Sequence, residues 1–70
     1  MKISARNQLK GKVVQFTAGA VNAEVVIEIE GGQQISSIIT KTSAENLGIE
    51  VGKEVYAIIK ASEVMIGIDE

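Results

Sequence analysis

Several residue types that build reactive or cross-linked sites are missing from this 70-residue sequence. It has no Cys, His, Pro or Trp, and Phe16 and Tyr56 are its only aromatic residues. The absence of Cys excludes disulfides, and the absence of Cys and His removes the usual ligands of zinc. The sequence also lacks a phosphate-binding loop, a Gly-x-Ser-x-Gly elbow and the acidic loop spacing of a calcium site. We therefore expect neither catalysis nor a bound metal cation.

An excess of positive charge is absent too. Seven Lys and Arg stand against nine Asp and Glu, for a formal net charge of −2, so the chain as a whole does not attract polyanions and any anion site must be local. No apolar run approaches the roughly 18 residues of a membrane span, and the first residues lead into charge and not into a signal-peptide core. These features predict a cytoplasmic protein that does not cross a membrane.

The chain is short for a stable core. A domain of this size buries only about 60% of the surface that its unfolded chain exposes. Small domains compensate with disulfides, a structural metal or self-association, and without Cys and His the third route remains. We expect one globular domain over residues 1–70 that forms a homo-oligomer.

Alternating hydrophobic residues predict an all-β fold. The clearest period-2 pattern covers residues 21–30, where Val21, Ala23, Val25, Ile27 and Ile29 share one face, as in a half-buried strand. Gly31 and Gly32 follow and suit the positive φ values of a hairpin turn. Five strands are predicted in all, over residues 10–17, 21–30, 33–40, 54–61 and 63–68.

One short helix is expected between the third and fourth strands. Residues 42–45 read Thr-Ser-Ala-Glu, a capping-box pattern that satisfies free N–H groups at a helix start, and Gly48 is suited to a left-handed stop. Strands and helix in this order predict a small five-stranded Greek-key barrel of the OB type. A different small β-barrel is the alternative.

Hydrogen-bond donors cluster near the ends of the predicted elements. A buried dianion needs several such donors and no nearby carboxylate. Each residue also has an ordinary structural explanation, as a surface arginine, the end of a strand or a helix cap. The donors are Ser4, Arg6, Asn7, Thr40, Ser43, Lys60 and Ser62.

Three segments in order resemble the molbindin family, small proteins and modules that bind molybdate or tungstate. They are residues 4–13 (SARNQLKGKV), residues 39–49 (ITKTSAENLGI) and residues 52–62 (GKEVYAIIKAS). The resemblance covers the whole chain. It implies reversible binding of an intact oxyanion for molybdenum storage and homeostasis, without a catalytic cofactor, by a hexamer built as a trimer of dimers.

The resemblance also implies a site that lies between subunits. Asn7 either contacts the anion or orients the opening segment. A second type of site, on threefold axes, would use the loop of Gly19, Ala20, Val21 and Asn22, which is otherwise an ordinary turn. The main site would combine Ser4, Arg6, Lys60, Ala61 and Ser62 of one chain with Thr40 and Ser43 of a neighbour.

Two other functions remain open at this point. An OB-type nucleic-acid binder would use aromatic stacking platforms along a basic groove, whereas this chain has two aromatic residues and a negative net charge. An oligomerisation module without a ligand is the other alternative.

Overall fold

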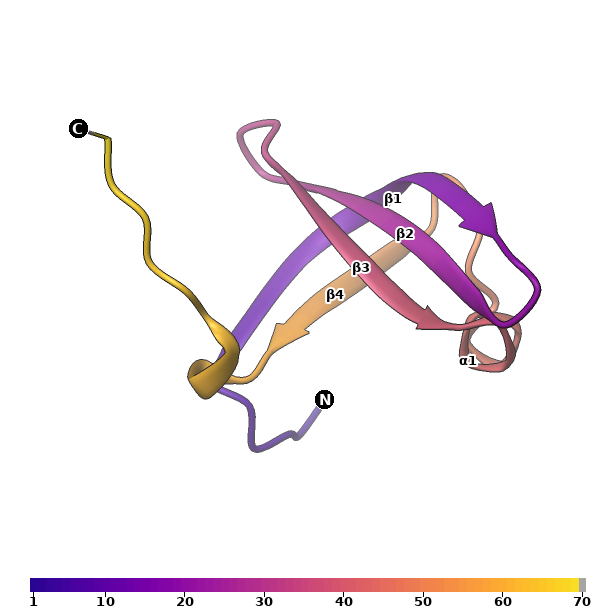
Figure 1. Cartoon of the computed structure of the whole chain (residues 1–70), viewed down its shortest axis with the longest axis horizontal. Coiled ribbons are helices and arrows are strands. Elements are labelled where there is room, and N and C mark those ends of the chain that lie inside the picture. Colours follow the sequence, from indigo (N-terminus) through magenta and orange to yellow (C-terminus); the bar gives the residue numbers. More distant parts are fainter. Residues whose placement is uncertain (70) are drawn as a thin grey trace.

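A computed structural model describes residues 1–69, which form one curled antiparallel sheet with a short helix at one end (Figure 1). Glu70, the last residue of the predicted domain, lies outside the described residues. The sheet order is β3-β2-β1-β4, and the helix lies between the third and fourth strands, as predicted. The elements are β1 (Asn7–Ala18), β2 (Asn22–Ile29), β3 (Gln34–Thr40), α1 (Lys41–Leu47), β4 (Glu54–Ile59) and the 3-10 helix η1 (Ala61–Glu63).

Strand β1 is the centre of the sheet because it pairs with two partners. Its first half pairs with β4, from Asn7 opposite Ile59 onward, and its second half pairs with β2. The β1–β2 register shifts between Val13 and Gln15, so β1 carries one extra residue there. Such a bulge bends a strand and increases its twist, which is consistent with the curl of the sheet in Figure 1.

The core lies on the concave face of this curled sheet. Val13, Val25, Ile27 and Ala57 form the buried cluster, so the predicted inward placement of Val25 and Ile27 is confirmed. Val26, between them, is buried as well, so burial does not alternate at the centre of β2. The placement of Val21 on the inward face is wrong, because this residue precedes β2 and is 72% exposed. The buried cluster is therefore small, with four residues.

The predicted turns are present. Gly31 and Gly32 both have positive φ, 92° and 87°, and the Ile29 N–H donates to the Gln33 carbonyl to close the hairpin. Gly48 ends α1 in the left-handed conformation, with φ 64°. Glycine is favoured at these positions because other residues pay a steric cost for positive φ.

The helix start was predicted two residues too late. Thr40, not Thr42, is the N-cap, and its Oγ1 accepts a hydrogen bond from the Ser43 N–H at 3.0 Å. Thr40 and Ser43 therefore take the N-cap and N3 positions of the helix, which the capping-box pattern places at Thr42 and Glu45. Two overlapping Ser/Thr patterns are present, and the end of β3 decides which hydroxyl acts as the cap.

The fifth predicted strand, residues 63–68, is wrong for the single chain. Within residues 1–69 the sheet has four strands, and the chain beyond β4 forms η1 and then an extended segment that leaves the sheet (Figure 1). Alternating hydrophobic residues indicate a segment with two different faces, but a strand also needs a partner to hydrogen-bond with.

No helix within residues 1–69 has the length and apolar character to cross a membrane.

Gly11 provides a test of the sheet geometry. It pairs with Ile29 on one side and Val55 on the other, and a Cβ added there would lie 2.5 Å from the Glu28 carbonyl oxygen. Gly11→Ala should lower the free energy of unfolding by about 1–3 kcal/mol, the usual cost of overpacking, as measured by urea denaturation. Gly67→Ala is the matched control, because nothing lies within 4 Å of its added Cβ. Equal urea midpoints for the two variants would contradict the close approach of β1 and β2.

Candidate functional site

A cavity of about 550 Å³ lies at the end of the sheet where β1 begins and β4 ends. Its polar lining side chains are two cations and two hydroxyls, and no carboxylate lines it. Five of the seven residues predicted for the main site take part, although the sequence separates them into two distant groups. The lining residues are Ser4, Ala5, Arg6, Ile58, Lys60, Ala61 and Ser62.

The β1–β4 ladder brings the two groups together. Because Asn7 lies opposite Ile59, the residues that precede β1 must lie beside those that follow β4. Asn7 adds a hydrogen bond from its Nδ2 to the Ile59 carbonyl at 3.2 Å, and Gln8 Nε2 donates to the Ala5 carbonyl at 3.1 Å. Of its two predicted roles, Asn7 therefore has contacts that suit orientation of the opening segment.

The other wall of the cavity is the 3-10 turn η1. Lys60 is its N-cap, and its carbonyl accepts from the Glu63 N–H at 2.9 Å. The first N–H groups of such a turn have no acceptor within the turn itself. Those of Ala61 and Ser62 are in this position, so backbone donors add to the side-chain donors on this wall.

The charges of the cavity are not compensated by ion pairs. Within residues 1–69 the one salt bridge joins Lys10 Nζ to Glu54 Oε1 at 3.2 Å, and this hydrogen bond, together with the charge of Glu54, raises the pKa of Lys10. Arg6 and Lys60 are exposed and have no such partner there. The local field is therefore positive although the chain is acidic overall.

This arrangement suits an anion. Arg6 offers a planar fork of N–H donors, Lys60 a second positive charge, and the serine hydroxyls neutral donors. The described residues contain no group of three or more His, Cys, Asp or Glu side chains that could hold a metal cation. The chemistry available in the cavity is therefore hydrogen-bond donation to an acceptor-rich, negatively charged ligand.

Thr40 and Ser43 do not reach this cavity within one chain. Thr40 ends β3 opposite Asn22, and Figure 1 shows α1 at the other end of the sheet from η1. The two hydroxyls lie together, with Thr40 Oγ1 donating to Ser43 Oγ at 2.8 Å. Within one chain, therefore, this pair lies apart from the five predicted residues that line the cavity.

The loop proposed for a second site is a tight turn. The Gly19 N–H donates to the Asn22 carbonyl at 2.8 Å, and the Val21 carbonyl accepts from the Lys41 N–H at 2.7 Å. The Gly19 N–H is therefore already used inside the turn. Ala20 and Val21 are exposed.

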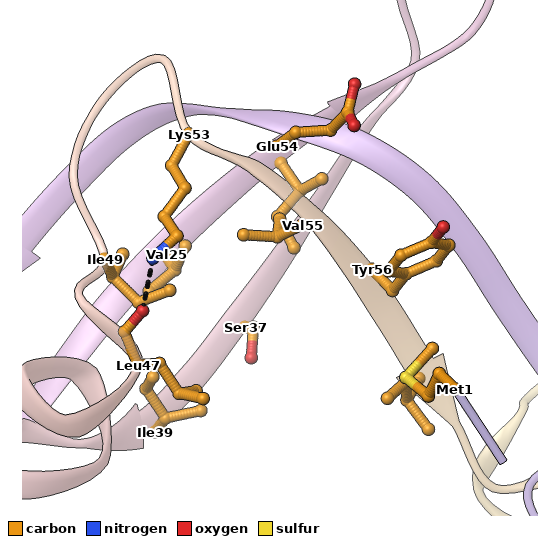
Figure 2. A pocket seen from close by; sticks show the side chains of 12 residues that line it. Met1, Val25, Ser37, Ile39, Leu47, Ile49, Lys53, Glu54, Val55 and Tyr56 are labelled. Atoms are coloured by element: carbon orange, nitrogen blue, oxygen red, sulfur yellow. Dashed lines mark hydrogen bonds between the residues drawn. The ribbon is translucent and has the colours of Figure 1, made fainter. Parts of the chain in front are cut away.

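A second hollow was not predicted from the sequence. This apolar groove, of about 350 Å³, lies on the concave face between β3 and β4 (Figure 2). Strands were predicted over residues 33–40 and 54–61, but the sequence did not indicate that an apolar surface between them would be left partly uncovered. The groove is lined by Met1, Val25, Ile27, Ser37, Ile39, Leu47, Ile49, Lys53, Glu54, Val55, Tyr56 and Ile58.

Comparison with known proteins gives close matches along the whole chain. Residues 3–66 match the TOBE domain family. A protein of Haemophilus influenzae described as a probable molybdenum-pterin-binding protein is 58% identical over 69 residues, covering 99% of this chain and 100% of that protein.

Two solved structures share the fold. MopII from Clostridium pasteurianum, in an apo form, is 55% identical with a TM-score of 0.91, and the match covers 96% of this chain and 100% of that one. The molybdate-binding protein ModG, solved with molybdate bound, is 43% identical with a TM-score of 0.93; the match covers 99% of this chain and 49% of that one. These matches confirm the family resemblance of the three sequence segments. The chain belongs to the TOBE domain family, together with the molybdenum-pterin-binding proteins.

Proposed function

We propose that this protein binds molybdate or tungstate as an intact oxyanion and performs no chemistry on it. The observation that carries the proposal is the cavity in which Arg6, Lys60 and the hydroxyls of Ser4 and Ser62 converge without a carboxylate. A tetrahedral dianion accepts hydrogen bonds and donates none, so a lining made of donors is complementary to it. The name of the Haemophilus influenzae relative, a probable molybdenum-pterin-binding protein, and the molybdate bound to ModG support this choice of anion.

Selection against sulfate would depend on size. Sulfate and molybdate are both acceptor-only tetrahedral dianions, and charge alone does not separate them. A cavity with donors spaced for the larger anion leaves some donors unpaired around the smaller one, which costs binding free energy. Molybdate and tungstate are close in size, so both should bind.

The complete site is shared between copies of the chain. Thr40 and Ser43 supply two hydroxyls at the end of the sheet opposite the cavity, so a neighbour would present them to Arg6 and Lys60. Association is also favoured by the surface, where exposed large hydrophobic side chains outnumber buried ones. A hexamer made of three dimers is the assembly that the family resemblance implies.

Reversible capture of this kind suits storage and homeostasis of molybdenum in the cytoplasm. An anion bound only by the assembled form stabilises that form by mass action. The fraction of assembled protein would then follow the supply of the anion.

Removal of the central cation tests the oxyanion site. A hydrogen bond to a charged group contributes about 1.5–3 kcal/mol, so Arg6→Ala should raise the Kd for molybdate about 10- to 100-fold, as measured by titration calorimetry with sulfate as the competing anion. Lys12→Ala is the matched control, since it removes one exposed cation of β1 that does not line the cavity. We expect it to bind like the wild type.

Three results would contradict this assignment. The wild-type protein could bind sulfate as tightly as molybdate, it could bind neither, or Arg6→Ala could bind molybdate with unchanged affinity. A circular dichroism spectrum of each variant verifies that the sheet is intact.

Subunit mixing tests whether the site is shared. Ser43→Ala removes a predicted ligand but keeps the backbone N–H that Thr40 caps, so this variant should fold and bind molybdate weakly. When Arg6→Ala and Ser43→Ala chains are mixed, unfolded and refolded together, some interfaces combine the intact Arg6 of one chain with the intact Ser43 of the other. We expect recovery of tight binding at about a quarter of the sites, on the simple assumption of random pairing. A mixture that binds no better than the separate variants would contradict a shared site.

A further inference from the structure

Helix α1 carries Ser43, yet its own sequence does little to stabilise it. The helix has seven residues, and isolated helices shorter than about 12–15 residues are marginal in water. Its last turn contains no basic residue to offset the partial negative charge of a helix C-terminus. Ala44 is its one buried residue. The position of α1 therefore depends on contacts from outside the helix.

Lys53 supplies a cation to the end of α1 from another part of the chain. It lies in the turn before β4, and its Nζ donates to the Leu47 carbonyl at 2.6 Å and to the Gly48 carbonyl at 3.2 Å (Figure 2). The last carbonyls of a helix have no N–H partner within the helix itself. One ammonium group thus gives two of them a donor and places positive charge at the favourable end of the helix dipole.

The backbone around Lys53 is fixed to the centre of the sheet. The Val13 N–H donates to the Lys53 carbonyl at 2.9 Å, and the Gly52 N–H donates to the Val13 carbonyl at 2.8 Å. Val13 belongs to β1, stands where the register with β2 shifts, and is 1% exposed. Lys53 therefore joins the last turn of α1 to a fully buried residue of the central strand.

The opposite end of α1 has its own attachment. Thr40 ends β3, and its Oγ1 accepts from the Ser43 N–H and donates to Ser43 Oγ. A helix held only at this end could pivot about it. Leu47 lies four residues, about one turn, after Ser43, so the hydrogen bond from Lys53 to Leu47 restrains the helix one turn away from the hydroxyl.

We infer that Lys53 is a positioning residue for oxyanion binding: it holds α1 so that Ser43 stays where a neighbouring copy's anion can meet it. The inference rests on the proposed function. Lys53 does not line the cavity, and its ammonium is engaged with the helix, so it acts through α1 and not on the anion. Without it, part of the conformational entropy of α1 would be lost only on binding, which weakens affinity.

Substitution of Lys53 tests this role. Lys53→Met keeps the length of the side chain but removes its charge and donors, so the Kd for molybdate should rise about 5- to 10-fold in titration calorimetry. Lys53→Arg keeps charge and donors and should bind within about twofold of the wild type, and Lys53→Gln, with donors but no charge, should fall between the two. Lys12→Met, which removes an exposed cation of β1, is the control and should bind like the wild type.

Hydrogen exchange measures the helix without the ligand. In Lys53→Met the amides of α1 should exchange faster than in the wild type, whereas those of the β1–β2 ladder should keep their rates, because local opening exposes only the segment that has lost its contacts. Lys53→Arg should restore slow exchange in α1.

Subunit mixing separates positioning from general stability. Arg6→Ala impairs the cavity side of the shared site and Lys53→Met the α1 side, so chains refolded together should regain wild-type affinity at about a quarter of the sites on random pairing. Lys53→Met mixed with Ser43→Ala should regain none, because both changes impair the α1 side. A general loss of stability would not distinguish the two mixtures.

The outcomes separate this inference from the proposed function. Lys53→Met with wild-type affinity or unchanged exchange in α1, in a protein that binds molybdate, would overturn the positioning role and leave the oxyanion site standing. Equal recovery in the two mixtures would do the same. If the wild type and Lys12→Met both failed to bind molybdate, the proposed function would fall and the inference with it.

Discussion

The antiparallel pairing of β1 with β4 determines both where the cavity lies and what lines it. Residues 4–6 and 60–62 are at opposite ends of the sequence, and the pairing of Asn7 with Ile59 places them side by side. A slip of one residue in this ladder would turn the inner face of β4 outward and would separate Arg6 from Lys60. Gly11 supports the register from within, since β1 is flanked there by β2 and β4 and has no room for a side chain on that face. The candidate binding residues lie just outside the β1–β4 ladder and are positioned by it.

The small size of the domain explains why so much apolar surface remains exposed on one chain. A domain of this length cannot enclose a large core, and only four residues form its buried cluster. The groove between β3 and β4 and the apolar side chains of the C-terminal segment remain uncovered in one chain. The proposed association would cover apolar surface and complete the proposed oxyanion site, so stability and ligand binding would depend on the same assembly.

Local sequence patterns predicted the parts of the fold that local chemistry controls. The hairpin glycines, the stop of α1 at Gly48 and the buried face of β2 at Ala23, Val25 and Ile27 depend on backbone conformation and on local burial, and they were predicted correctly. The five cavity residues were identified through the family resemblance, and the ladder explains their convergence. The cap at Thr40 was missed because two hydroxyl patterns overlap there. The fifth strand was predicted from its alternation, but pairing is a property of two segments, and no pattern within one segment specifies its partner.

The turn η1 connects the cavity to the C-terminal segment. Ala61 and Ser62 line the cavity, and the segment begins directly after Glu63. An anion held by the N–H groups of this turn and by Lys60 would fix the position of the turn and, with it, the direction in which the segment leaves. Such ordering costs conformational entropy in the few residues that it holds. The proposed oxyanion binding would therefore order the start of the C-terminal segment as well as the cavity.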